Sequence, residues 1–150
     1  MRPGRRARAL PGFLSMKYTP ELYSLTLVST ATALMWVPYV VARMTTHGVM
    51  RAIGNPGPGY PSDAPWVDRA RRAHINAIEN LAVFAPLVLV GAMIDVSTKA
   101  TVLSARIYVV ACLAHYVIYA AGIPVLRTLA FLVGACATLV IAVSLLFTPN

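Results

Sequence analysis

Charged residues are scarce in this chain, and acidic residues are the scarcest. Only 12% of the 150 residues are charged and five are acidic, whereas about 25% of the residues in an ordinary soluble domain are charged. Hydrophobic residues make up 58% of the chain, and the mean hydropathy is +0.68. This balance argues against a typical soluble domain and indicates an integral, multi-pass membrane protein.

Several chemical signatures are also missing. The two cysteines, Cys112 and Cys136, lie far apart inside hydrophobic segments, so we expect neither a disulfide framework nor a metal site. No HExxH motif, Cys/His metal spacing or Ser-His-Asp set is present. The segment GNPGPGYPSDAP lacks the Gly-Lys-Ser/Thr ending of a phosphate loop, and its prolines remove amide donors. We therefore expect no metal and no phosphate-binding loop of this kind.

The basic residues are more numerous and give a formal net charge of +8. Most of them lie beside the ends of hydrophobic segments or in the short N-terminal tail, which holds Arg2, Arg5, Arg6 and Arg8. This placement is typical of contact with the membrane surface and of topology signals. We therefore expect no nucleic-acid partner.

Four hydrophobic stretches are each about 20 residues long, enough to cross about 30 Å of hydrocarbon. They predict an all-α membrane protein, with a four-transmembrane-helix bundle from residue 18 to residue 150 after a basic tail at residues 1–17. Short second and third connections make successive helices antiparallel neighbours. The stretches are Leu22–Ala42, Ala73–Ile94, Ile107–Leu126 and Thr128–Phe147.

The start of translation affects the expected orientation. Translation could begin at Met16, because MKYTPELYS reads like a complete start. Without the arginine-rich tail, the basic residues favour a cytoplasmic first connection; with the tail they are balanced and the positive-inside rule is silent.

Helix boundaries follow from local signals. The Thr19-Pro20-Glu21 sequence predicts a helix start, and that helix should run to about Met44 with a kink at Pro38. The Gly- and Pro-rich connection, roughly residues 45–65, fits a structured loop over a site or a plain linker, and we favour the linker. The later helices are predicted at about 65–94, 99–121 and 124–147, since Gly122-Ile123-Pro124 ends one helix and starts another.

The second of these helices carries a polar stripe. At about 100° per residue, Arg69, Arg72, Asn76 and Glu79 fall within a sector of roughly 80°. A charge in hydrocarbon costs at least about 2.5 kcal/mol, so it needs partners or a purpose. A ligand with a carboxylate near Arg72 and an ammonium near Glu79 would match this order. Alternatively, Glu79 pairs with an arginine of a neighbouring helix and Asn76 joins helices. His74 faces the opposite side, which favours an interfacial or interhelix contact over a catalytic role.

The third helix has its own stripe at spacings of four, three and four residues: Tyr108, Cys112, His115 and Tyr119. For Tyr108 and Cys112 we favour core packing. For His115 and Tyr119 a functional role and simple packing are equally compatible, because polar side chains inside a bundle usually mark a cavity or an interhelix hydrogen bond.

Two arginines lie close to helix ends on the same membrane side. Arg127, at the start of the fourth helix, could extend to the interface or stabilise a thiolate or peroxide oxygen. Arg43 could do either. Arg106 lies about 160° from Tyr108 on the third helix and faces away from this region, which favours packing or an ion pair.

At these residues the chain resembles the MAPEG family, the membrane-associated proteins of eicosanoid and glutathione metabolism. The segment RAHINAIENLAVFAPLVL is similar to the family's Arg-Ala-x-x-Asn-x-x-Glu signature with a following Phe-x-Pro-Leu. The resemblance implies a four-helix subunit, a homotrimer and glutathione bound between neighbouring subunits by Arg72, Asn76 and Glu79. His115 and Tyr119 match a His-x-x-x-Tyr pattern of the prostaglandin synthase branch. Arg127 resembles the arginine that activates the glutathione thiol in the leukotriene synthase branch.

The sequence departs from those branches at three places. Ile75 stands where the prostaglandin synthase branch has a further arginine, and the spacing from His115 to Arg127 is one residue shorter. Asn80 stands where the leukotriene branch has a tyrosine. The chain looks more like the short bacterial-type members, so the resemblance implies a location in a bacterial inner membrane.

The resemblance implies a glutathione-dependent transferase or peroxidase that acts on a lipophilic electrophile or hydroperoxide. Arg127 and Tyr119 are then the candidate catalytic residues. Arg43 and His115 join the three residues of the signature as candidate glutathione-binding residues. The family also contains a non-catalytic lipid-binding member, so the alternative is a membrane protein that binds lipids or partners.

Overall fold

The computed structural model describes residues 17–148 apart from residues 56 and 58, and every regular element in that part of the chain is a helix. Four segments are long and apolar enough to span a membrane, with α1 and α2 together forming the first. The protein is therefore an all-α, multi-pass membrane protein, as predicted. The basic tail expected at residues 1–17 lies outside the described residues except for Lys17. The helices are α1 (Pro20–Leu34), α2 (Trp36–His47), α3 (Val49–Ile53), α4 (Pro65–Met93), α5 (Lys99–Ala121) and α6 (Pro124–Leu146).

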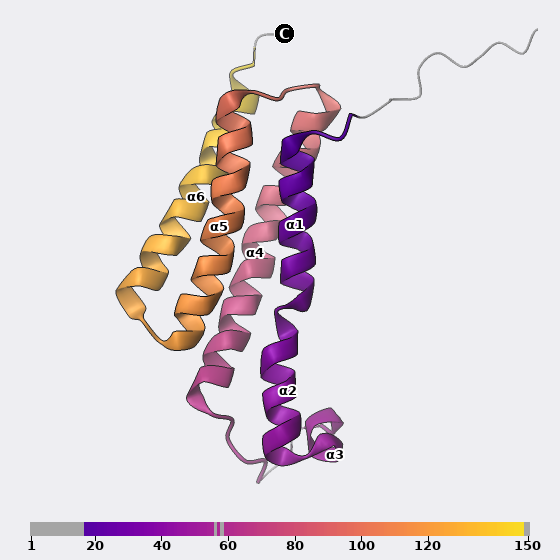
Figure 1. Cartoon of the computed structure of the whole chain (residues 1–150), viewed down its shortest axis with the longest axis vertical. Coiled ribbons are helices and arrows are strands. Elements are labelled where there is room, and N and C mark those ends of the chain that lie inside the picture. The colour runs from indigo at the N-terminus through magenta and orange to yellow at the C-terminus, as the bar shows by residue number, and fades with distance from the viewer. Residues whose placement is uncertain (1–16, 56, 58, 149–150) are drawn as a thin grey trace, which may run out of the picture.

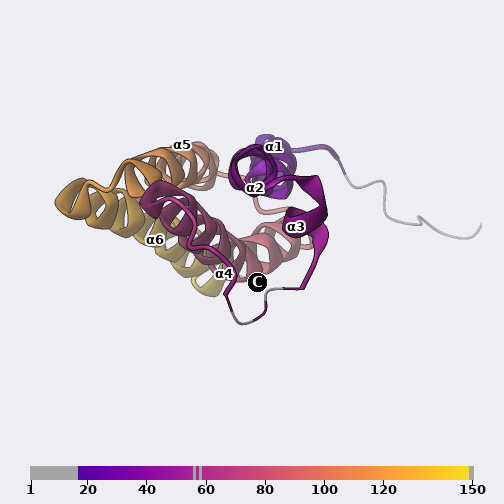
Figure 2. The ribbon, with the colours of Figure 1, turned by 90° about the horizontal axis from the view of Figure 1, so that it is seen from below.

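The long helices run up and down beside one another (Figure 1). α1 and α2 follow each other along one side, and α4 returns next to them. α5 contacts α1, α4 and α6, and α4 contacts α1, α2, α5 and α6. The view along the bundle in Figure 2 shows α5 and α6 together at the end away from α3.

The first span is interrupted at Met35, between α1 and α2. We expected one helix kinked at Pro38. Pro38 has no N–H to donate to the carbonyl of Leu34, and its ring crowds that carbonyl, so the helix breaks one turn before the proline. The hydroxyl of Tyr116 on α5 donates a hydrogen bond of 2.8 Å to the carbonyl of Met35, which holds the break against the bundle.

The ends of α5 agree with the local signals. Thr98 and Thr101 form a capping box at its start, and Gly122 follows its end with a left-handed φ of 82°. Only glycine adopts that conformation without steric cost. The predicted range of the third helix is confirmed, and α4 and α6 each end one residue before their predicted ends.

The core lies where α1, α4, α5 and α6 meet. Phe84 on α4 stacks on Tyr108 on α5, with ring centroids 3.7 Å apart and planes 5° from parallel. Tyr108 is only 3% exposed, which confirms its predicted core position. At one end of the core, the buried Glu21 carboxylate accepts hydrogen bonds from Ser97 at 3.0 Å and from Thr101 at 2.6 Å. These bonds join the start of α1 to the start of α5.

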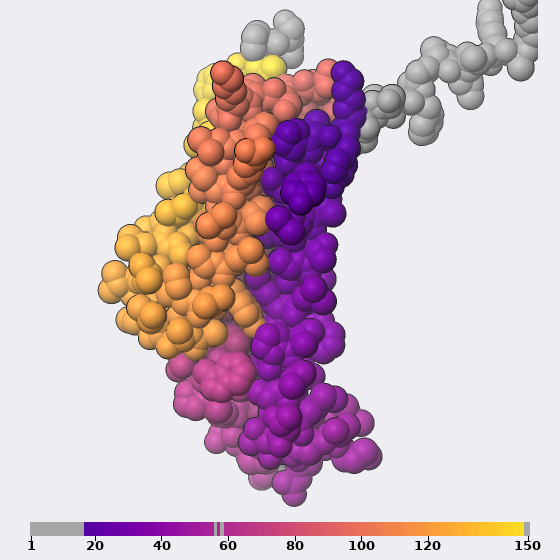
Figure 3. Space-filling model, viewed as in Figure 1, coloured from indigo at the N-terminus to yellow at the C-terminus, as the bar shows by residue number. Residues whose placement is uncertain are grey.

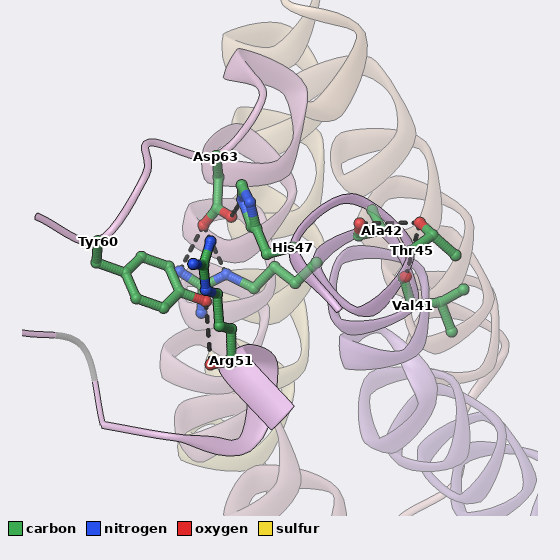
Figure 4. A network of polar contacts seen from close by, with 8 residues as sticks. Val41, Ala42, Thr45, His47, Arg51, Tyr60 and Asp63 are labelled. Carbon is green, nitrogen blue, oxygen red and sulfur yellow. Dashed lines mark hydrogen bonds and ion pairs between the residues drawn. The ribbon is translucent and has the colours of Figure 1, made fainter. Parts of the chain in front are cut away.

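The connection between the first two spans is more ordered than the linker we favoured. It contains α3 and is tied to α2 by the polar network of Figure 4. Arg43 Nε donates a hydrogen bond of 2.6 Å to the Asp63 carboxylate, whose other oxygen lies 3.3 Å from His47 Nε2. The hydroxyl of Tyr60 donates to the carbonyl of Arg51. The hydrogen bond from Arg43 keeps the pKa of Asp63 below its usual value.

Candidate functional site

An open groove of about 260 Å³ lies where α4, α5 and the first turns of α6 meet. Three of the predicted functional residues from α5 and α6 line it, together with one from α4. The lining residues are Asn76, His115, Tyr119, Arg127, Thr128 and Phe131. The structure thus brings both candidate catalytic residues and two candidate binding residues to one surface.

Arg127 is held at this groove by α5. Its guanidinium carbon lies 4.4 Å from the centre of the Tyr119 ring, a distance at which a cation is attracted to the face of an aromatic ring. The ring of Tyr119 also meets His115 edge to face, with centroids 5.5 Å apart. The guanidinium of Arg127 is therefore held against the Tyr119 ring at the side of the groove.

His115 has a defined tautomer in this arrangement. Its Nδ1 lies 2.9 Å from the carbonyl oxygen of Arg127. A carbonyl can only accept, so Nδ1 carries a proton and donates it. In the neutral ring Nε2 is then an acceptor, and this buried atom has no hydrogen-bond partner within the described residues. His115 therefore joins α5 to the start of α6 while keeping one free acceptor.

A smaller cavity continues from the groove into the bundle. It shares Asn76, His115 and Phe131 with the groove and is also lined by Asn80 and Cys112. The Asn80 side-chain amide donates to the carbonyl and the side-chain oxygen of Asn76, at 2.7 and 3.0 Å. Asn76 is therefore fixed in position by a residue one helical turn away.

Arg72 and Glu79 lie on a different surface of α4. Both side chains belong to exposed residues, whereas Asn76 is half-buried. Their helical positions differ by only about 20°, so they share one face, and Asn76 lies at the edge between that face and the groove. In a single chain no other helix covers this face within the described residues, although Glu79 lies at the middle of α4.

The side chain of Arg69 does not act with the rest of the polar stripe. Its Nε donates a hydrogen bond of 3.1 Å to the carbonyl of Ala120 at the end of α5. Its guanidinium covers Gly122, where an added Cβ would lie 3.0 Å from Arg69 Cζ. Arg69 therefore caps the C-terminal end of α5, and Arg72 is the arginine of the stripe that stays exposed beside Glu79.

Two further predicted positions lie away from the groove. Arg43 binds Asp63 on the first connection and does not line the groove. His74 Nδ1 lies 3.0 Å from the hydroxyl of Tyr39 on α2, which confirms the predicted interhelix contact.

Besides alanines and a glycine, three residues that line the groove or the cavity were not predicted. Phe131 and Thr128 on α6 carried no chemical signal, because an aromatic and a hydroxyl residue are ordinary in an apolar helix. Asn80 was noted only as a departure from a family pattern. An amide inside a membrane span is itself a signal for a polar cavity or an interhelix bond, and it could have identified this position.

One protein-family model matches most of this chain. The model of the MAPEG family matches residues 23–147, which include every groove residue and all four spans except the first three residues of the first span. The chain belongs to the MAPEG family. No curated protein matches it. Members of this family generally use glutathione, and membership supports a glutathione-related transferase or peroxidase type of function in the membrane.

Proposed function

We propose that this protein is a glutathione-dependent transferase or peroxidase that acts on a lipophilic electrophile or hydroperoxide. The observation that carries the proposal is the groove that joins Asn76, His115, Tyr119 and Arg127, beside the exposed face of α4 with Arg72 and Glu79. A substrate soluble in the bilayer can reach such a groove from the hydrocarbon.

The charges on α4 suit the two ends of glutathione. Arg72 offers a fork of donors to a carboxylate, and Glu79 accepts from the ammonium group of the γ-glutamyl end. Asn76 Nδ2 and the free His115 Nε2 supply a donor and an acceptor to the peptide part. Arg43 does not line the groove and is paired with Asp63. It would bind a glutathione carboxylate only if that pairing were broken.

The thiol then belongs near Arg127. A cation favours the thiolate over the thiol, because the two opposite charges attract. The Tyr119 hydroxyl can donate a hydrogen bond to the thiolate or to an oxygen of the substrate. In the transferase reaction the thiolate sulfur forms a bond to the electrophilic carbon and the leaving group departs with the electron pair, so the thiol proton ends in solvent or on the leaving group.

We propose a homotrimer in a bacterial inner membrane. Glu79 at the middle of a span is costly if lipid covers it, and a neighbouring subunit packed against the exposed face of α4 would remove it from lipid. Glutathione would then lie between subunits, with the groove of one chain on one side.

The experiment is turnover of a chlorodinitrobenzene with glutathione by the purified oligomer. We expect Arg127→Ala to lower kcat/KM by about 100-fold, similar to the removal of one preorganised charge stabiliser in other enzymes. Arg71→Ala, an exposed arginine outside the groove, is the control and should retain activity. Unchanged activity in both Arg127→Ala and Glu79→Gln would refute the assignment of these sites.

The alternative is a non-catalytic membrane protein that binds lipids or partners. The exposed face of α4 is compatible with it, because polar residues on such a face can join subunits without binding a ligand. In that case glutathione would not bind in calorimetry or raise the melting temperature. Glu79→Gln would instead dissociate the oligomer.

A further inference from the structure

Arg106 on α5 is a membrane-embedded arginine that the groove does not use. It lies seven residues after Lys99, or about 10 Å along the helix at 1.5 Å per residue. The residue is exposed on the side of α5 that carries Val110, itself 67% exposed. Figure 3 shows one face of the molecule, on which α5 lies between α1 and α6. An arginine at this depth is costly unless an anion accompanies it.

No acidic side chain in the described part of the chain supplies such an anion. The sequence has five acidic residues, and Arg106 forms no ion pair with any of them in the described part of the chain. Glu21 is buried and bonded to hydroxyl groups, and Asp63 is bound to Arg43. The other three lie in the first turn of α4, at its middle and in the connection before α5: Asp68, Glu79 and Asp95.

Two apolar grooves meet at Arg106. One, of about 400 Å³, runs between α1 and α5, and the other, of about 390 Å³, runs between α5 and α6. Arg106 and Val110 line both grooves, so the charge stands where they join. The rest of the lining is almost wholly apolar; Tyr23 and Ser24 of α1 add the main hydroxyl groups.

We propose that this surface binds an anionic phospholipid, with its phosphate on Arg106 and an acyl chain in each groove. A phospholipid has the required combination of one negative head and two apolar chains, and basic pockets between membrane helices recognise such heads. The leaflet is the one at the Lys99 end of α5. Helical side chains tilt toward the N-terminus of their helix, so Arg106 extends toward that interface, where Lys17 and Lys99 add positive charge.

This site is separate from the glutathione groove, and the proposal holds whether or not the protein turns over glutathione. Groove residues Asn76, Tyr119 and Arg127 line neither lipid groove. The surface is also distinct from the exposed face of α4 that we assign to the subunit interface.

The test is native mass spectrometry of the full chain, with phosphatidylglycerol or phosphatidylcholine added in equal amounts. We expect phosphatidylglycerol to be retained preferentially, and Arg106→Gln to weaken its apparent affinity about tenfold, as for the loss of one charge-assisted hydrogen bond. Arg71→Gln, an exposed arginine at the opposite end of the bundle, is the matched control and should bind the lipid as the unaltered chain does. Inorganic phosphate alone should not compete, because it has no acyl chains.

A second variant guards against misfolding of Arg106→Gln. Val110→Trp keeps the charge but fills the place where both grooves meet, and we expect it to reduce phosphatidylglycerol retention as well. Equal retention of the two lipids by the unaltered chain, or full retention by both variants, would overturn the proposal. A change in oligomer mass in Arg106→Gln with lipid binding intact would show instead that a second copy covers this surface.

Discussion

Two adjacent arginines test the site at the scale of single residues. Arg71 and Arg72 are both exposed but point about 100° apart on α4, and only Arg72 shares a face with Glu79. We expect Arg72→Ala to weaken glutathione binding about tenfold or more, the value of a charge-assisted hydrogen bond. Arg71→Ala should bind normally. Isothermal titration calorimetry measures both, and equal losses in the two variants would mean that general positive charge, and not helix phase, attracts the ligand.

His115 is the other residue whose role depends on one atom. The donor at Nδ1 is already used by the carbonyl of Arg127, so only Nε2 can face a ligand. His115→Gln keeps polarity but not the ring that meets Tyr119, and we expect it to lower glutathione affinity and also to loosen the start of α6. Calorimetry reports the first effect, and hydrogen exchange of residues 124–128 reports the second. Faster exchange without any loss of affinity would leave His115 with a structural role alone.

At the scale of elements, the Asp63 contacts hold the first connection against α2. Because the pKa of Asp63 is lowered in the folded protein, its pairing stabilises the connection above the ordinary aspartate pKa of 3.8. That stability is lost as the pH falls through the lowered pKa. We therefore expect lower hydrogen-exchange protection factors for the amides of residues 54–62 at strongly acidic pH, after correction for the pH dependence of the intrinsic exchange rate.

The same release should occur at neutral pH in Asp63→Asn, because an amide cannot form the ion pair with Arg43. Asp95→Asn is the matched control: Asp95 lies in the connection before α5 with a φ of 57°, which asparagine tolerates. Hydrogen-exchange mass spectrometry compares the two. If both variants exchange like the unaltered chain at neutral pH, the network does not order the connection.

At the scale of the whole molecule, the exposure of Glu79 supports the proposed assembly. It is exposed near the middle of a 29-residue helix in a single chain, where lipid contact would cost at least about 2.5 kcal/mol. We expect the protein in mild detergent to have three times the 16.1 kDa mass of one chain, measured by light scattering with correction for detergent. Glu79→Gln should keep that mass while losing glutathione affinity. A monomeric variant that still bound glutathione would contradict this assignment.

Local sequence patterns were sufficient to predict most helix boundaries. They did not predict features that depend on contacts with residues far away in the sequence. Thr98 caps the start of α5 and Gly122 follows its end, so residues next to the helix set both of its boundaries. The predicted range of this helix matched the observed one. The break at Met35 was displaced from Pro38, because a proline disturbs the turn before it and Tyr116 from another helix stabilises the result. The network around Asp63 joins residues far apart in sequence, so composition suggested only a linker.

The sequence by itself determined that this is a four-span membrane protein with a charged stripe on its second span, because hydropathy, length and helical phase are properties of neighbouring residues. It did not determine which members of that stripe act together. In the tertiary structure Arg69 is bound to the end of α5 and Arg43 to Asp63. The same packing places His115, Tyr119 and Arg127 in one groove. Those choices depend on how the helices rotate and pack against one another, and no single helix contains that information.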